Sequence, residues 1–243
     1  MENYFNDEGI LAPECMNEAH LLVIIVIDKS GSMIGKPIDQ VVRSINRFRQ
    51  DICKDPNAAE LVDICIIAFN DKAEIVQDWT SIKNMEPVKI TADGCTNLSV
   101  ALNMMQDKLK EREKYYRELG MGVRRPYAVL LSDGYDSYGN NIDPIAQNIR
   151  KRTKEKKLLP WFMGVPGYNK ETAVKITGGP RVLELVDEKA YDFTGFFQVL
   201  EVSLKIESAS AQTENVTIKD EDDPLQKEDC SVRAAKLESW LND

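Results

Sequence analysis

Residues 21–27 read LLVIIVI, and this run of apolar, mostly β-branched residues constrains the fold more than any other segment. A strand with one solvated face alternates polar and apolar residues, whereas a continuous apolar run is typical of a strand buried on both faces. The run is far too short to cross a membrane as a helix, which takes about 20 apolar residues. It therefore predicts the central strand of an α/β domain.

Strand-like and helix-like segments alternate along the rest of the chain. Residues 62–69 predict a second strand, and residues 73–79 predict an antiparallel edge strand with one exposed face, after a turn at Asn70 and Asp71. Further strands are expected at residues 127–131, 161–165 and 182–186, and helices at residues 37–52, 98–118, 142–157, 170–176 and 193–204. This order predicts a Rossmann-like three-layer α/β sandwich, with a mostly parallel central sheet, one antiparallel edge strand and helices on both faces.

Three polar segments are expected to face solvent. The charged half of the helix that ends near Glu118 is expected to project from the domain or fray. The basic run at residues 150–157 (RKRTKEKK) has two interpretations, a polyanion patch or a solvated helix end whose cations complement the helix dipole, and we favour the second. Beyond residue 207 the sequence is polar and acidic, which is typical of a mobile tail.

These patterns divide the chain into three parts. Residues 1–20 form an N-terminal extension, residues 21–206 form the domain, and residues 207–243 form the tail. Within the tail, residues 232–241 have the spacing of a short helix, which would either dock a partner or pack back on the domain.

Composition narrows the class of partner. The formal net charge is −9, whereas proteins that bind nucleic acid present basic surfaces. The five Cys residues include no CxxC pair, and His20 is the one His, so neither a disulfide framework nor a zinc site of His and Cys is indicated. Residues 1–15 are acidic and unlike a signal peptide. We therefore expect a cytoplasmic protein with neither a nucleic-acid nor a membrane partner.

The segment DKSGS, directly after the central strand, carries the most chemistry. Asp28, Ser30 and Ser32 are spaced two residues apart, so an extended turn points all three the same way, and Gly31 lets the chain turn tightly between them. Ligands of open α/β sheets bind at the carboxyl ends of the strands, which is where this segment lies. One carboxylate and two hydroxyls are hard oxygen donors, which favour Mg²⁺, Mn²⁺ or Ca²⁺.

Two further segments offer oxygen donors at the same predicted edge. Residues 93–98 (DGCTNL) lead into a helix and supply the hydroxyl of Thr96. Residues 130–134 (LLSDG) end another buried strand and supply the carboxylate of Asp133. Taken alone, the aspartates and Thr96 would each suit a plain helix cap, but caps do not explain the five-part set.

This set resembles the metal-ion-dependent adhesion site (MIDAS) of the von Willebrand factor A (VWA) family, in which Asp-x-Ser-x-Ser, a Thr and an Asp lie on three loops. All five positions are filled here, by Asp28, Ser30, Ser32, Thr96 and Asp133. The resemblance covers roughly residues 21–207, and it departs from the family at Cys95, where Gly is usual. It implies a non-catalytic module that binds one divalent ion, Mg²⁺ with Mn²⁺ or Ca²⁺ as alternatives, and a protein partner that supplies an acidic residue to the metal.

Within the family, the segment DKSGSMIGKPI and the compact size are similar to the VWA proteins of tellurium-resistance (Ter-type) gene clusters. That resemblance implies a bacterial, cytoplasmic adaptor in a stress-response or phosphorylation system, with kinase- or phosphatase-like partners.

Two other functions stay open from the residues alone. One is a metal-dependent phosphatase or hydrolase with Asp28 as nucleophile, although Ser30 stands where the DxDxT order would place the acid, and no His or Glu lies in the motif as a base. The other is an extracellular adhesin, which residues 1–15 disfavour. Tyr135 and Tyr138, beside Asp133, are candidates for flanking a partner's anchor.

Overall fold

The computed structural model describes residues 18–187, 189–209, 223–227 and 229–235. The strands are β1 Leu21–Asp28, β2 Val62–Phe69, β3 Ala73–Ser81, β4 Tyr127–Ser132, β5 Leu159–Gly164, β6 Val182–Leu185 and β7 Val232–Ala234. The α-helices are α1 Lys36–Ile52, α2 Pro56–Leu61, α3 Leu98–Glu118, α4 Asp143–Lys154, α5 Lys170–Thr177 and α6 Thr194–Ala209. Short 3₁₀ turns are η1 Gly31–Met33, η2 Ile82–Asn84 and η3 Pro224–Gln226.

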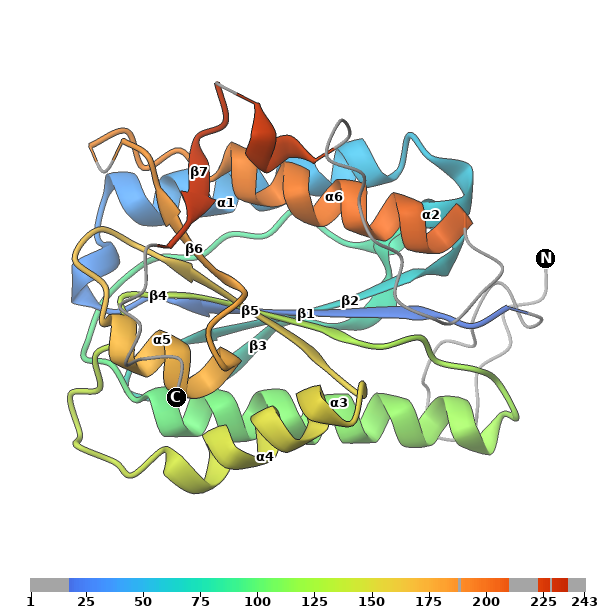
Figure 1. Ribbon diagram of the computed structural model, residues 1–243, viewed down its shortest axis with the longest axis horizontal. Coiled ribbons are helices and arrows are strands. Elements are labelled where there is room, and N and C mark those ends of the chain that lie inside the picture. Colours follow the sequence, from blue (N-terminus) through green and yellow to red (C-terminus); the bar gives the residue numbers. More distant parts are fainter. Residues whose placement is uncertain (1–17, 188, 210–222, 228, 236–243) are drawn as a thin grey trace.

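All seven strands form one sheet in the order β3-β2-β1-β4-β5-β6-β7. The pairs β1–β2, β1–β4, β4–β5 and β5–β6 are parallel, whereas β3 and β7 run antiparallel to their neighbours at the two edges. Helices α1, α2 and α6 cover one face and α3, α4 and α5 cover the other (Figure 1). The predicted three-layer sandwich with its antiparallel edge at β3 is confirmed.

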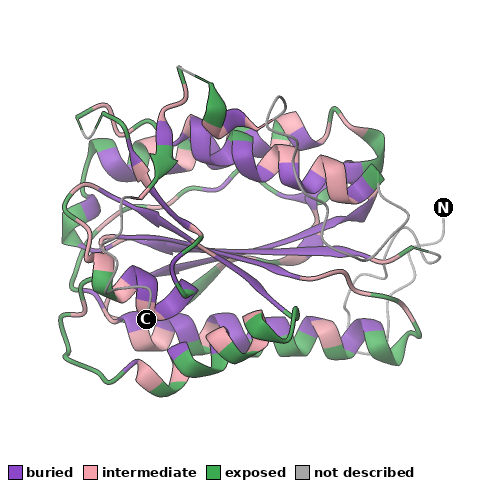
Figure 2. Ribbon diagram, in the orientation of Figure 1, coloured by how far each residue is buried: buried purple, intermediate pink, exposed green. Residues whose placement is uncertain are grey.

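Strand β1 lies at the centre of both halves of the core. Its eight residues are buried (Figure 2). Val23 and Ile25 pack with the α1 and α6 side chains, whereas Ile24 and Val26 pack with those of α3 and α5. A continuous apolar run is what a strand covered by helices on both faces requires, so residues 21–27 have the predicted role.

Strand β7 corrects the expectation of a helix at residues 232–241. Val232 is 1% exposed and pairs antiparallel with Leu185 of β6, and Arg233 donates to Glu184 at 3.0 Å. Residues 236–241 lie outside the described residues. Strand β7 has three residues, and only Val232 is buried. So short a strand shows no alternation of polar and apolar residues from which it could have been predicted. Helix α6 extends to Ala209, and the boundary of the tail stays a prediction.

The second half of α3 is packed against the sheet, which corrects the expectation that it projects or frays. Arg112 donates to Asp63 of β2 at 3.0 Å, and both side chains are buried. The Tyr116 hydroxyl also donates to Asp63 and lies 3.0 Å from His20 Nδ1. Burial alone would raise the pKa of Asp63, but the hydrogen bond from His20 and the charge of Arg112 hold this pKa below its usual value. Arg112 can lie on the buried side of α3 because Asp63 is its buried counter-ion.

No described helix combines the length and the apolar character needed to cross a membrane.

Candidate metal centre

The five predicted metal-ligating residues lie on loops at the carboxyl edge of the sheet. Asp28 is the last residue of β1, and Ser30 and Ser32 follow it in the turn that contains η1. Asp133 follows the last residue of β4, the strand that pairs in parallel with β1. Thr96 lies two residues before α3 and is 5% exposed. The topology therefore brings two strand ends and one helix entry to the same edge.

Backbone hydrogen bonds tie the β1 turn to the loop that carries Thr96. Gly31 N donates to Gly94 O at 3.0 Å, and Asp93 N donates to Lys29 O at 2.8 Å. A Cβ on Gly31 would lie 3.3 Å from Gly94 O, so this approach of two backbones favours glycine. The position of Thr96 relative to Asp28 is thus fixed mainly by main-chain contacts.

The same loop is tied to the segment that follows β4. Ser137 N donates to Thr96 O at 2.8 Å, and Thr96 N donates to Ser137 Oγ at 3.1 Å. Asp136 Oδ1 accepts from Leu98 N, at the start of α3, at 2.8 Å. The Thr96 loop therefore holds the turn after β1 and the loop after β4 in one unit.

The carboxylate of Asp28 is 0% exposed and both of its oxygens accept hydrogen bonds. Oδ1 accepts from Ser30 N at 2.9 Å, and Oδ2 accepts from Ser132 Oγ at 2.7 Å. The Ser30 and Ser32 hydroxyl oxygens lie 3.2 Å apart, so these two side chains point to the same place. Ser132 orients Asp28 across the strand pair, and sequence reasoning missed this role, although Ser132 is the polar end of the buried run before Asp133.

The negative charges of Asp28 and Asp133 repel one another at this edge of the sheet. Burial raises the pKa of Asp28, the hydrogen bonds from Ser30 and Ser132 oppose the rise, and the negative charge of Asp133 adds to it. Lys29, the nearest cation in sequence, lies 2.8 Å from Glu74 of β3 instead. Within the described residues neither Asp28 nor Asp133 takes part in an ion pair. The two carboxylates therefore lie in one another's field without a counter-ion.

The donor set fits a hard divalent cation. Nowhere in the described ranges do three or more His, Cys, Asp or Glu side chains group to hold a metal, so a metal at this edge would depend on hydroxyl oxygens as well. Two carboxylates and three hydroxyls are oxygen donors of the kind that Mg²⁺, Mn²⁺ and Ca²⁺ take. A divalent cation would also offset the repulsion between Asp28 and Asp133.

Large side chains surround the candidate ligands on the same loops. Ile34, directly after η1, is 63% exposed, and Tyr135 and Tyr138 are 55% and 52% exposed. The Tyr138 hydroxyl donates to Asp71 Oδ1 at 2.7 Å, and the same oxygen accepts from Cys95 N at 3.4 Å. The tyrosines were expected from the sequence, but Ile34 was not, because a single apolar residue after a turn carries no pattern.

One family model matches the sequence. Residues 23–135 match the family model of the von Willebrand factor type A domain, a span that includes all five candidate ligands. No curated protein matches the sequence at a significant level.

Solved structures with the same fold include a byssus thread protein, a pilus adhesin and a minor pilin. Proximal thread matrix protein 1 from the mussel byssus, with a zinc-occupied MIDAS motif, is 15% identical with a TM-score of 0.52, over 80% of this chain and 47% of that one. The pilus adhesin SpaC of Lactobacillus rhamnosus GG is 14% identical with a TM-score of 0.60, over 79% of this chain and 30% of that one. The minor pilin PilB of Streptococcus sanguinis is 14% identical with a TM-score of 0.57, over 79% and 63%.

These likenesses show the fold, which is that of a VWA domain. The chain spans about half the length of the byssus protein, at 47%. VWA domains are typically modules for adhesion or protein interaction, and one relative carries a metal in its MIDAS motif. The Ter-type resemblance, the identity of the metal and the cytoplasmic location stay predictions.

Proposed function

We propose that this chain is a metal-dependent protein-interaction module. Its divalent cation, Mg²⁺ or Mn²⁺ with Ca²⁺ as an alternative, would be held by the five residues Asp28, Ser30, Ser32, Thr96 and Asp133. The observation that carries the proposal is that hydrogen bonds join three loops and place the two carboxylates in one field without a counter-ion. Such an arrangement costs stability unless a cation occupies it.

The partner is proposed to supply an acidic residue to the cation. Two carboxylates and three neutral hydroxyls leave a divalent ion short of ligands, because Mg²⁺ takes six oxygens and usually keeps several waters. Asp28 is engaged by Ser30 and Ser132, so the open side of the site faces outward, where Ser32 is exposed. Ile34 and Tyr135 offer apolar area beside this opening, and tyrosine is enriched in the cores of interfaces.

Hydrolysis with Asp28 as nucleophile is less well supported. A nucleophilic carboxylate must reach its substrate, but Asp28 is 0% exposed and both of its oxygens accept hydrogen bonds. No His or Glu lies on the segments that carry the five candidate ligands, so these loops offer no general base of that kind.

The finer proposal is a cytoplasmic adaptor in a bacterial stress-response or phosphorylation system, with kinase- or phosphatase-like partners. Its support is the sequence similarity of residues 28–38 (DKSGSMIGKPI) to Ter-type VWA proteins. Capture from a bacterial extract in Mg²⁺, followed by identification of the retained proteins, tests this assignment separately from the metal site.

The experiment that tests the module itself compares capture of a partner in Mg²⁺ and in EDTA, with wild type, Asp28→Ala and Thr96→Ala. We expect capture to require Mg²⁺ and to be lost in Asp28→Ala. Asp93→Ala is the matched control, because Asp93 is an exposed carboxylate on the same loop as Thr96 and is not a proposed ligand. Tight binding that survives both EDTA and Asp28→Ala would contradict the metal-bridged mechanism.

A further inference from the structure

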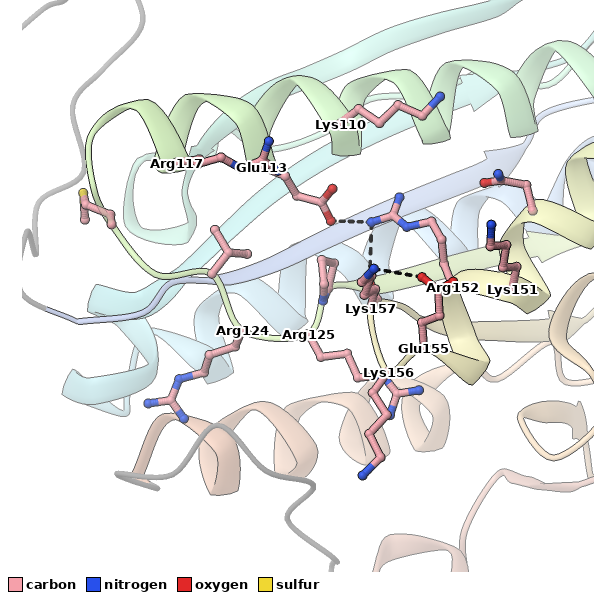
Figure 3. Close-up of a pocket in the computed structure, with 14 residues that line it drawn as sticks. Lys110, Glu113, Arg117, Arg124, Arg125, Lys151, Arg152, Glu155, Lys156 and Lys157 are labelled. Atoms are coloured by element: carbon pink, nitrogen blue, oxygen red, sulfur yellow. Dashed lines mark hydrogen bonds and ion pairs between the residues drawn. The ribbon is translucent and has the colours of Figure 1, made fainter.

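We propose a second binding site, for a chain of phosphate groups, at the edge of the sheet opposite the candidate metal centre. A pocket of about 590 Å³ lies there, between the C-terminal halves of α3 and α4 (Figure 3). Pro126 of its lining directly precedes β4, and Lys157 lies two residues before β5. The pocket is thus at the amino edge of the parallel strands, whereas Asp28 and Asp133 are at the carboxyl edge.

The lining is strongly basic in a chain whose formal net charge is −9. Eight of the fourteen lining residues are Lys or Arg and two are Glu, a formal charge of 8 − 2 = +6. Both acidic residues are paired with cations of the pocket, since Arg152 binds Glu113 and Lys157 lies 2.8 Å from Glu155 (Figure 3). The remaining cations give the pocket a field that attracts anions.

Several donors of the pocket are available to a ligand. The side chains of Arg117, Lys151 and Lys156 are exposed and make no hydrogen bond or ion pair within the described part of the chain. Arg152 uses Nη2 to bind Glu113 and the Lys157 carbonyl, but its Nη1 is buried without a hydrogen-bond partner. An unpaired buried donor costs free energy. An anionic oxygen that reaches this guanidinium therefore gains more binding free energy than one that binds an exposed arginine.

The backbone at Lys156 places a cation where glycine is favoured. Lys156 has a φ of 56°, in the left-handed region. It closes α4, because Lys156 N donates to Thr153 O at 3.0 Å and Lys157 N donates to Arg152 O at 2.8 Å, the pattern of a helix end that usually carries Gly. A lysine at this strained position is consistent with a use for its charge, since strain of this kind gathers at functional sites.

A compact phosphate chain suits the pocket better than the other anions do. The volume of the pocket lies within the range of roughly 300–1,000 Å³ that is typical of small-molecule sites. Among the described residues no aromatic ring lines it, so a nucleotide base would have no aromatic ring to stack on and recognition would rest mainly on the phosphates. Guanidinium and ammonium groups mixed on one wall are the usual phosphate donors.

This assignment revises the interpretation of residues 150–157 as a solvated helix end. Five of these eight residues line the pocket, and they face Arg117 and Lys110 of α3 across it. The basic run is visible in the sequence, but the other wall of the pocket comes from residues of α3 more than 30 positions away.

The test is calorimetric titration of the full chain with tripolyphosphate, ATP and sulfate, in EDTA and at about 0.05 M salt so that surface charges are little screened. We expect tripolyphosphate to bind, ATP to bind within about threefold of it, and sulfate to bind at least about tenfold more weakly, since its two charges meet fewer donors. Asp28→Ala should bind tripolyphosphate like wild type, which separates this site from the metal centre.

Variants then locate the site. Lys151→Ala and Lys156→Gly are each expected to weaken tripolyphosphate binding by roughly two- to fivefold, the effect of one lost exposed charge contact. Lys156→Gly should melt no lower than wild type, because glycine adopts this backbone without strain, so its loss of affinity is not a loss of folding. Lys114→Ala is the matched control, since Lys114 is a 70% exposed cation of α3 outside the pocket lining.

The proposal is overturned by any of three results. These are no heat of binding with tripolyphosphate, equal weakening in Lys114→Ala, and a poly-glutamate peptide that binds when the phosphates do not. The last result would assign the pocket to an acidic protein segment. ATP binding far tighter than tripolyphosphate would show base recognition and would also contradict a site built for the phosphate chain.

Discussion

At the scale of single residues, the carboxylate of Asp28 is shielded from solvent, accepts hydrogen bonds from Ser30 and Ser132, and lies in the field of Asp133. Replacing it with the isosteric amide removes a buried charge. We therefore expect Asp28→Asn to unfold in EDTA with a free energy equal to that of wild type or higher by roughly 0.5–2 kcal/mol.

The same substitution is expected to abolish stabilisation by metal. A ligand at a hundredfold excess over its Kd adds about 2.7 kcal/mol to the native state, which is about 5 °C or more in Tm for a domain of this size. Wild type should show this gain with Mg²⁺ and Asp28→Asn should not, in urea and thermal unfolding. Asp93→Asn serves as control and should keep the gain. An equal response to Mg²⁺ in Asp28→Asn would refute the site assignment.

Asp63 gives the molecule a predictable response to acid. Its pKa is held below the value of about 3.9 that it has in the unfolded chain. The native state therefore binds a proton less readily, so the stabilisation is complete above the unfolded pKa and is lost as pH falls through the lower native pKa. Asp63→Asn should cost about 3–5 kcal/mol at neutral pH, because it leaves the charge of Arg112 buried and unpaired.

Urea unfolding between about pH 7 and pH 2 measures this effect. The difference between wild type and Asp63→Asn is expected to be constant near neutral pH and to shrink below about pH 4. Adding Arg112→Met to Asp63→Asn should restore part of the lost stability, since no unpaired charge then remains. A difference that does not change with pH would show that Asp63 contributes through packing alone.

At the scale of elements, the sequence predicted those whose patterns are local. The continuous apolar run of β1 reflects burial on both faces of the sheet, and the three- and four-residue spacing in α1 reflects burial of one helix face. The ligand loops were predicted for the same reason, because strand ends of a parallel sheet share an edge.

Elements that depend on distant partners were not predicted. The charged half of α3 packs because Arg112 meets Asp63, which is 49 residues away. Ser132 orients Asp28 across 104 residues, and β7 is a strand only because β6 offers it an edge. The spacing of neighbouring residues in the sequence does not indicate contacts with partners this far away.

Strand β7 yields a prediction about truncation. Val232 is 1% exposed, and the Ser231 hydroxyl accepts from Gly195 N, at the start of α6, at 2.8 Å. A chain that ends at Asp223 would lose both contacts and the pairing with β6. We expect it to lose about 2 kcal/mol or more, a fall of roughly 4–8 °C in Tm. A chain that ends at Ala235 is the control and should melt near wild type. Equal melting of the two truncated chains would contradict a structural role for β7.

At the scale of the whole molecule, charge is divided between the two ends of the sheet. Asp28, Asp71, Asp93, Asp133 and Asp136 gather on the loops of the carboxyl edge. The described lining of the pocket at the amino edge has a formal charge of +6. An acidic partner would thus meet repulsion at one edge, except where a divalent cation binds, and attraction at the other.

Salt should therefore affect the two edges differently. Raising salt from about 0.05 M to about 0.5 M shortens the Debye length well below 10 Å and screens the exposed cations of the pocket. Tripolyphosphate affinity is expected to fall at least about tenfold over this range, since several exposed cations contribute. A partner's carboxylate bound directly to Mg²⁺ is screened much less, and the surrounding aspartates that oppose its approach are screened more. Capture through the metal should then change by less than about threefold. Titration of both ligands across this salt range, in wild type and in Lys151→Ala, measures the contrast. A parallel fall in both affinities would show that one diffuse electrostatic surface, rather than two separate sites, accounts for binding.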